Sequence, residues 1–163
     1  MYQLLYDETK NEIYQIDPNG NKTTITDDFP SKPDFSPNNK MAIYISPLEW
    51  ECSGSLYLYN LENGYITEIV SPDENDYIPK FAKWLDNQNI AVIIGYGAGM
   101  VAVGGNVFIY NIKDRSLKQL TNYPSEIQIT QLSKKYSALE LQGIKYIDDN
   151  HSRFEGFKEK IAL

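Results

Sequence analysis

Few side chains in this sequence are of the kinds that perform covalent or metal chemistry. The single cysteine, Cys52, and the single histidine, His151, lie about a hundred residues apart, and no family signature surrounds the cysteine. One cysteine excludes a disulfide within the chain, and one histidine argues against a typical zinc site. The motifs G-x-S-x-G and H-E-x-x-H are absent. We therefore expect no cofactor and no metal, and no catalytic residue can be named.

Carboxylates are numerous enough to leave one enzymatic alternative open. A hydrolase of the glycosidase type needs two carboxyl groups about 5 Å or more apart, and 22 Asp and Glu residues provide many pairs. The segment from Asp17 to Asp28 also carries oxygen ligands with the spacing of a calcium loop, but Lys22 stands where such loops need glycine. Turn formation by Pro-Asn-Gly explains this segment without a metal.

Two long loops are the best candidates for a binding site. The first, Ser46–Gly54, carries a tryptophan between two carboxylates, and the second is the glycine-rich segment that follows Tyr96. Long loops on a rigid scaffold often carry binding sites, and an exposed aromatic side chain is a frequent anchor. The candidate binding residues are Glu49, Trp50, Glu51, Tyr96 and Met100. The alternative is that Trp50 folds back onto the edge of its own sheet.

The glycine-rich loop also fits a permissive dinucleotide-binding pattern. Gly97-Ala98-Gly99-Met100-Val101-Ala102 has the spacing G-x-G-x-x-A. Such a site needs a helix to begin at the loop, whereas this segment runs into Gly104-Gly105 and a further apolar stretch. We therefore interpret it as a loop between two strands.

Composition favours an all-β protein. The 163 residues include 18 Ile and 13 Tyr but only seven Ala, and β-branched and aromatic side chains suit strands better than helices. The net charge of −7 argues against nucleic acid as a partner, because phosphate recognition needs clustered Lys and Arg. The charge is unevenly distributed: residues 1–79 carry 14 acidic and 4 basic side chains, and residues 80–163 carry 8 and 11, giving −10 and +3.

Internal repeats predict the architecture. Residues 55–61 match residues 106–112, and residues 33–45 match residues 82–94, at offsets of 51 and 49 positions. A period in this range with about four strands per repeat is typical of propeller blades. We expect one domain, residues 1–163, with blades near 1–28 (lacking its inner strand), 32–70, 80–121 and 127–161. The fold class is therefore all-β, with four antiparallel blade-like sheets in a small or partial β-propeller.

Two observations bear on alternatives to this fold. Strands such as Leu56-Tyr57-Leu58-Tyr59 are apolar on both faces, which suits stacked blades better than a β-sandwich, the alternative, whose outer faces are polar. Ile129, Leu132, Tyr136 and Leu139 have helical spacing, but the repeat alignment makes the same stretch two strands, and we follow the alignment. Trp84, Phe35, Phe81 and Phe108 are expected in the core.

Parts of the chain resemble the TolB-like β-propeller repeat. The segments concerned are Phe35–Tyr44, Leu56–Gly64 and Thr67–Ile69, although Asn38-Asn39 replaces the Asp-Gly turn usual in that family. The stretch from Ile93 to Val107 also resembles a small uncharacterised family of bacterial (Firmicutes) propeller-like domains, some of them attached to lipoprotein leaders. These resemblances imply the fold, and no activity.

The sequence therefore predicts a non-enzymatic propeller-type module that binds a protein or a small ligand through its long loops. The alternatives are a carboxylate-dependent hydrolase at the propeller mouth and a structural half-ring that forms a homodimer. The least charged stretch, Asn89–Ile112, contains five glycines and is no membrane span. Met1–Asp7 has no basic segment typical of a signal peptide. We expect a cytoplasmic protein or, if a leader precedes these residues, an extracytoplasmic lipoprotein domain.

Overall fold

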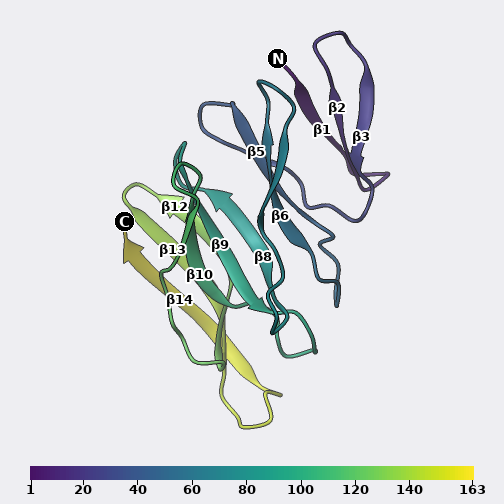
Figure 1. Ribbon diagram of the computed structural model, residues 1–163. Helices are drawn as coiled ribbons and strands as arrows, with labels where there is room; N and C mark the ends of the chain where they lie inside the picture. The colour runs from purple at the N-terminus through teal and green to yellow at the C-terminus, as the bar shows by residue number, and fades with distance from the viewer.

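The computed structural model describes all 163 residues, Met1–Leu163, and contains fourteen β-strands (Figure 1). It has no helix, so none that is long and apolar enough to cross a membrane. The strands form four antiparallel sheets, each built from consecutive strands of the chain. The all-β class and the four antiparallel sheets predicted from the repeats are confirmed.

The sheets are made of simple up-and-down strands. The first holds β1 (Gln3–Asp7), β2 (Glu12–Ile16) and β3 (Lys22–Thr26). The second holds β4 (Asp34–Phe35), β5 (Met41–Ser46), β6 (Ser55–Asn60) and β7 (Ile66–Val70). The third holds β8 (Tyr77–Trp84), β9 (Asn89–Tyr96), β10 (Asn106–Asn111) and β11 (Ser116–Gln119). The fourth holds β12 (Ile127–Lys135), β13 (Ala138–Tyr146) and β14 (Phe154–Ala162).

The middle sheets are buried on both faces. In β9 the four residues Ile90, Ala91, Val92 and Ile93 are all fully buried. Successive side chains of a strand point to opposite faces, so Ile90 and Val92 pack toward the second sheet and Ala91 and Ile93 toward the fourth. The repeats are apolar on both faces because each middle sheet packs between two others. The sheets are therefore stacked in series and do not form a two-sheet sandwich.

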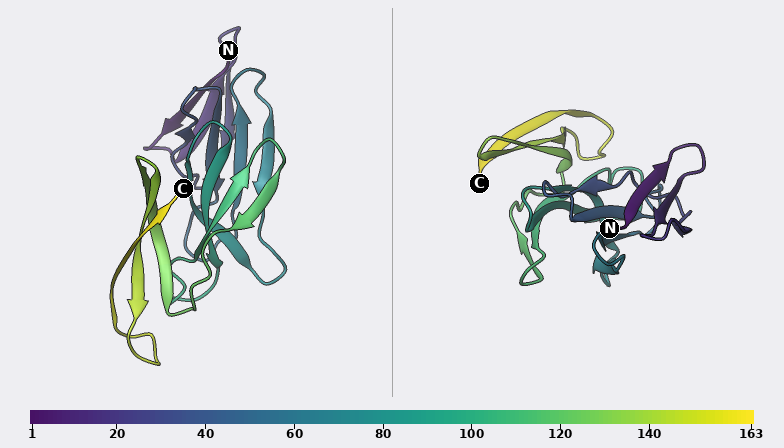
Figure 2. Two further views of the ribbon diagram at one scale, coloured as in Figure 1. Left: turned by 90° about the vertical axis from the view of Figure 1, so that its left-hand side faces the viewer. Right: turned by 90° about the horizontal axis from the view of Figure 1, so that it is seen from above.

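The sheets are joined in sequence order and do not close into a ring. Three apolar clusters lie between the first and second, second and third, and third and fourth sheets. No cluster and no hydrogen bond joins the first sheet to the fourth. Figure 2 shows these two sheets at opposite ends of the molecule, which is an open arc of blades.

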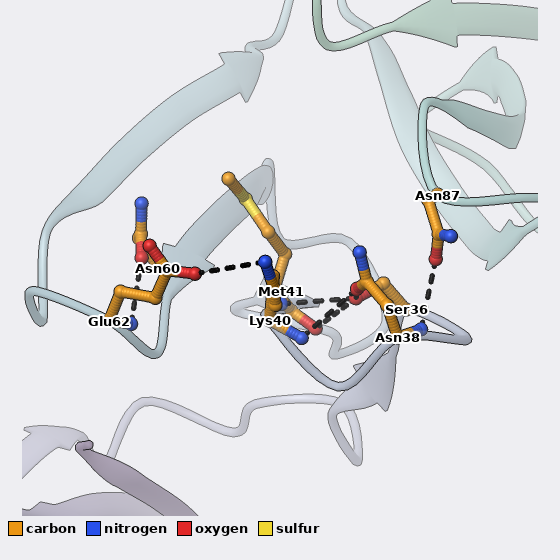
Figure 3. Close-up of polar contacts among 7 residues, drawn as sticks. All are labelled: Ser36, Asn38, Lys40, Met41, Asn60, Glu62 and Asn87. Carbon is orange, nitrogen blue, oxygen red and sulfur yellow. Dashed lines mark hydrogen bonds and ion pairs between the residues drawn. The ribbon is translucent and has the colours of Figure 1, made fainter.

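Polar turns connect equivalent positions of neighbouring sheets. In the turn after β4, Ser36 Oγ donates to Asn38 Oδ1 at 2.8 Å and accepts from the Met41 backbone N–H at 3.0 Å. The Asn38 N–H donates to Asn87 Oδ1 of the third sheet at 2.9 Å (Figure 3). Asn38 and Asn87 are 49 residues apart, the offset of the repeat alignment.

The segment with helical spacing, residues 129–139, lies in two strands joined by a tight turn. Ile129 and Leu132 lie in β12, Leu139 lies in β13, and Tyr136 sits in the tight turn between them. The alignment of the repeats therefore predicted this segment correctly.

One of the aromatic residues expected in the core lies at the surface. Phe35 is 39% exposed, because it belongs to a two-residue strand at the edge of its sheet. The expectation that Phe35 is a core residue was therefore wrong. Trp84 is buried as expected, and Phe81 and Phe108 are half-buried.

Candidate functional site

The two long loops belong to the two middle sheets and meet at the same end of their strands. The β5–β6 loop, residues 47–54, belongs to the second sheet, and the β9–β10 loop, residues 97–105, belongs to the third. Asp76, in the connection between these sheets, links them: its carboxylate accepts from Ser53 Oγ at 2.8 Å, and its backbone carbonyl accepts from the Gly97 N–H at 2.8 Å. Loops from different repeats are therefore fixed relative to each other.

A pocket of about 360 Å³ lies between these loops and the start of β8. The β5–β6 loop contributes Pro47, Leu48, Glu49, Trp50, Glu51 and Cys52; β8 contributes Ile78, Pro79 and Lys80; and the β9–β10 loop contributes Gly97, Gly99, Met100, Ala102 and Val103. Half of these residues are hydrophobic. A pocket that combines apolar walls with a few polar groups is typical of small-ligand sites.

Four of the five candidate binding residues lie in this pocket. Glu49, Trp50 and Glu51 line it from one loop and Met100 from the other. Trp50 is 66% exposed and Met100 79% exposed, so Trp50 does not fold back onto the edge of its own sheet. Both side chains stand at the surface, where a ligand can contact them.

Tyr96 lies beside this pocket and not in it. Its ring packs against Tyr77 with the ring centroids 6.0 Å apart, at the edge of a neighbouring hollow of about 460 Å³. The two pockets share Ala102 as a wall residue. The structure therefore separates Tyr96 from the other four residues by the width of the β9–β10 loop.

Lys80 is the pocket residue that sequence reasoning missed. It is half-buried, and its ammonium donates a hydrogen bond of 2.6 Å to the carbonyl of Ala102. Burial away from water lowers its pKa to about 8. No carboxylate lies within ion-pair distance of it. The available signal was one lysine within an otherwise uncharged run, Tyr77–Ala82.

A smaller hollow, separate from the one beside Tyr96, continues from Lys80 along the boundary between the second and third sheets. It has a volume of about 240 Å³ and shares Lys80 and Leu48 with the pocket. Its other walls are mostly apolar side chains of β5 and β8, together with Lys32 and Asp34. Lys80 therefore stands at the junction of two hollows.

The glycine-rich loop has a structural explanation. A Cβ at Gly104 would overlap the carbonyl oxygen of Ile129 in the fourth sheet, and the Gly104 N–H donates to Oε1 of buried Gln128 at 3.0 Å. Gly105 and Ile129 form a β-bridge. The loop enters β10 directly, with no helix on which a pyrophosphate could rest. Its glycines permit contact between backbones of neighbouring sheets.

The remaining chemical candidates have local explanations. Asp17 accepts hydrogen bonds at 2.9 Å from the N–H groups of Asn19 and Asn21, which lower its pKa and fix a turn. The His151 ring packs edge-on against Tyr146 at 4.7 Å, whereas Cys52 lies in the wall of the pocket. No group of three or more His, Cys, Asp or Glu side chains is arranged to hold a metal ion.

Comparison with known proteins gives a family and a fold. Residues 49–163 match the model of a family described as a domain of unknown function, DUF4652. No curated protein matches the chain. Among solved structures, a candidate conserved lipoprotein from Clostridium novyi NT is 26% identical, with a TM-score of 0.76, over 82% of this chain and 87% of that one.

Larger proteins contain a similar arrangement of blades. The β-propeller domain of the Trilobed protease from Pyrococcus furiosus, described as having an open velcro topology, is 10% identical with a TM-score of 0.57, over 98% of this chain and 48% of that one. A prolyl endopeptidase is 15% identical with a TM-score of 0.63, over 99% of this chain and 25% of that one. At these identities the likeness shows the propeller-like fold alone.

Proposed function

This chain belongs to the DUF4652 family, and we propose that it is a non-enzymatic binding module that holds its ligand between the β5–β6 and β9–β10 loops. One observation carries the proposal: the two loops that interrupt the repeats come from neighbouring sheets and line one pocket of about 360 Å³. Rigid sheets below and long loops above are the usual plan of a binding site.

Trp50 and Met100 provide the apolar contacts. They lie on opposite loops, and both are well exposed. An aromatic ring offers a large contact area at a small entropic cost, and the flexible thioether of methionine adapts to different ligand shapes. Tyr96 and Tyr77 extend the same surface across the β9–β10 loop.

The proposal predicts that a neutral apolar dye binds in the pocket through Trp50. We expect Nile red to gain fluorescence on binding the native chain, and the variants Trp50→Ala and Met100→Ala each to weaken binding by about tenfold or more. Loss of one buried aromatic or methionine contact has an effect of this size. Dye titration, with circular dichroism to confirm folding, measures the change.

Tyr136→Ala is the matched control. Tyr136 is 90% exposed but lies in the tight turn between β12 and β13, away from the pocket. It should leave dye binding unchanged. If Trp50→Ala and Met100→Ala bind the dye as the native chain does, the pocket is not the binding site.

The hydrolase alternative finds no support in the arrangement of carboxylates. A general acid of this kind needs a raised pKa, whereas the carboxyl groups with shifted values, those of Asp17, Asp86, Asp114 and Asp148, are all shifted downward. None of these four lines the pocket. The carboxyl groups therefore support a binding function over a hydrolase.

Two finer assignments accompany this proposal. The segments Phe35–Tyr44 and Leu56–Gly64 support a TolB-like type for the propeller repeats. The similarity to a candidate lipoprotein supports the extracytoplasmic alternative over the cytoplasmic one. Binding of cysteine-reactive, membrane-impermeant label to Cys52 in intact cells tests the localisation, because this is the only cysteine.

A further inference from the structure

The charge on Lys80 has no partner within the protein. Its ammonium donates one hydrogen bond, to the carbonyl of Ala102, and forms no ion pair. A lysine ammonium has three donors, and removing it from water is unfavourable unless a counter-charge compensates. A half-buried lysine in a pocket wall is therefore suited to receive an anion.

Other charged and titratable groups surround the lysine without neutralising it. Such groups line both the pocket and the smaller hollow that continues from Lys80. They are Glu49, Glu51 and Cys52 of the β5–β6 loop, Lys32 and Asp34 at the start of the second sheet, and Tyr44 of β5. The β9–β10 loop contributes none. Glu49 and Glu51 are exposed, so water screens them. The Asp34 carboxylate is already used, because it accepts from the Trp84 backbone N–H at 2.9 Å.

This distribution of charge selects among anions. The pocket wall holds one cation, Lys80. A phosphate or another multiply charged anion would keep a charge that no second cation of the wall compensates. A carboxylate carries one charge and suits one ammonium.

The remaining walls define the body of the ligand. Ile78, Pro79, Ala102 and Val103 are apolar, and Trp50 and Met100 stand above them. A volume of about 360 Å³ accommodates a small molecule or the last residue or two of a peptide.

We propose that this pocket binds an apolar or aromatic monocarboxylate, with the Lys80 ammonium as the counter-ion of the carboxylate and Trp50 and Met100 covering the apolar body. The inference rests on the proposed binding function and specifies its ligand class. The carboxylate belongs to a free organic acid or to a polypeptide C-terminus; these share the same chemistry at Lys80.

A matched pair of ligands tests the proposal. Octanoate and octanamide have the same apolar chain and differ in charge, and displacement of Nile red measures their affinities. We expect octanoate to bind the native chain at least about tenfold more tightly, since hydrogen bonds to a charged partner are the strong ones. Lys80→Met should abolish the difference, and Lys80→Arg should retain it.

Lys83→Met is the control variant. Lys83 lies in the same strand, β8, but lines neither the pocket nor the smaller hollow. This variant should therefore keep the native preference for octanoate over octanamide. Alkylation of Cys52 by iodoacetamide gives a second measure, because a ligand in the pocket should slow the reaction at this wall residue. At a given octanoate concentration, Cys52 should be protected more strongly in the native chain than in Lys80→Met.

The pH dependence gives a signature that packing alone does not produce. The pKa of Lys80 is about 8 in the structure, and a carboxylic acid stays ionised above pH 6. Octanoate affinity should therefore decline between pH 7 and pH 10 as the lysine loses its proton. In Lys80→Met the same affinity should not change with pH.

A second pair separates the two sources of the carboxylate. It consists of an acetylated tripeptide that ends in phenylalanine, with a free C-terminus or with an amide. A preference for the acid in the octanoate pair alone identifies a free organic acid, and a preference in the peptide pair identifies a polypeptide C-terminus.

Equal affinity within both pairs, unchanged in Lys80→Met, overturns the inference. The binding function still stands in that case if Nile red binding depends on Trp50. Loss of that dependence overturns the binding function itself, so the two failures are distinguishable.

Discussion

Lys80 occupies a position that disfavours its own charge. Its pKa is lowered from 10.5 to about 8 because protein atoms replace water around the ammonium. The unfolded chain keeps the ordinary value and therefore binds more protons between pH 8 and pH 10. Stability rises with pH wherever the unfolded state binds more protons, so the destabilisation caused by burying the Lys80 charge should decrease as the pH rises through that window.

The prediction concerns the difference between the native chain and Lys80→Met. We expect the free energy of unfolding of the native chain to rise relative to that of the variant by about 1 kcal/mol between pH 7 and pH 10, a value reduced because the side chain is partly exposed. Urea denaturation at both pH values measures it. Tyr44 and the other tyrosines are common to both proteins and cancel. A constant or falling difference would show that Lys80 is not buried in this way.

Sequence reasoning found pocket residues where they interrupted a repeat. Trp50 and Met100 stand in long insertions, and an insertion is visible as soon as two repeats are aligned. Lys80 lies inside a strand, where one lysine usually points to solvent, so its burial depends on the neighbouring loop that only the fold supplies. Tyr96 is adjacent in sequence to the β9–β10 loop, but it ends β9 and faces the neighbouring hollow.

At the level of elements, the β9–β10 loop is held by its contact with the fourth sheet. Gly104 donates to Gln128, whose amide donates in turn to the carbonyls of Val101 and Ser125. Tyr146 of β13 also donates to the Val101 carbonyl, at 3.0 Å. One wall of the pocket is therefore positioned by a sheet that does not itself line the pocket.

We predict that Gly104→Ala destabilises the protein by about 2 kcal/mol or more. The new methyl group would overlap the carbonyl of Ile129, a backbone atom that cannot rotate away. Gly156→Ala in β14 is the control, because a Cβ there meets no atom within 4 Å, and it should change stability by no more than about 0.5 kcal/mol. Thermal unfolding of both variants compares the effects. Similar melting temperatures would contradict the close approach of loop and sheet.

Repeat spacing predicted the elements better than local periodicity did. Asn38 contacts Asn87, and Lys134 donates to the Leu85 carbonyl at 2.8 Å; both pairs are separated by 49 residues. Equivalent positions of successive blades meet because each blade packs on the next. The helical spacing of Ile129, Leu132 and Leu139 was coincidental, since these side chains pack against the third sheet from two strands. The edge exposure of Phe35 depends on the shortness of β4, which no spacing reveals.

On the scale of the whole molecule, the strands run between two ends that differ in character: the loop end, where the β5–β6 and β9–β10 loops lie, and the opposite end. The loop end carries exposed apolar side chains, among them Trp50, Tyr77, Tyr96 and Met100. The opposite end has short polar turns, such as the one at Asn38. Exposed apolar side chains grouped around neighbouring pockets are typical of an interaction site. The carboxylate pocket lies within this end of the molecule.

The end sheets of an open arc also differ in the faces that they leave without a neighbour. On the fourth sheet the strand register places Glu140, Gln142, Lys158 and Lys160 on this face and the exposed ring of Phe154 toward one end of it. On the first sheet, Leu5 and Tyr14 are directly paired on the outer face, and the Lys22 ammonium lies 4.3 Å from the centre of the Tyr14 ring. The charges of −10 and +3 divide between the first two and the last two sheets.

Polar side chains in the middle of the fourth sheet's outer face, and the Lys22 ammonium over Tyr14 on that of the first, suit terminal repeats that remain in water, so we predict that the isolated chain is monomeric. A stable interface buries about 1,000 Å² or more with an apolar centre, and Lys158, Lys160, Glu140 and Gln142 would have to be desolvated to form one. Light scattering at physiological salt should give a mass near 18.7 kDa at all concentrations. A mass twice as large would instead favour the half-ring that dimerises. Association seen only at low ionic strength would come from attraction between the acidic and basic halves, because salt screens exposed charges.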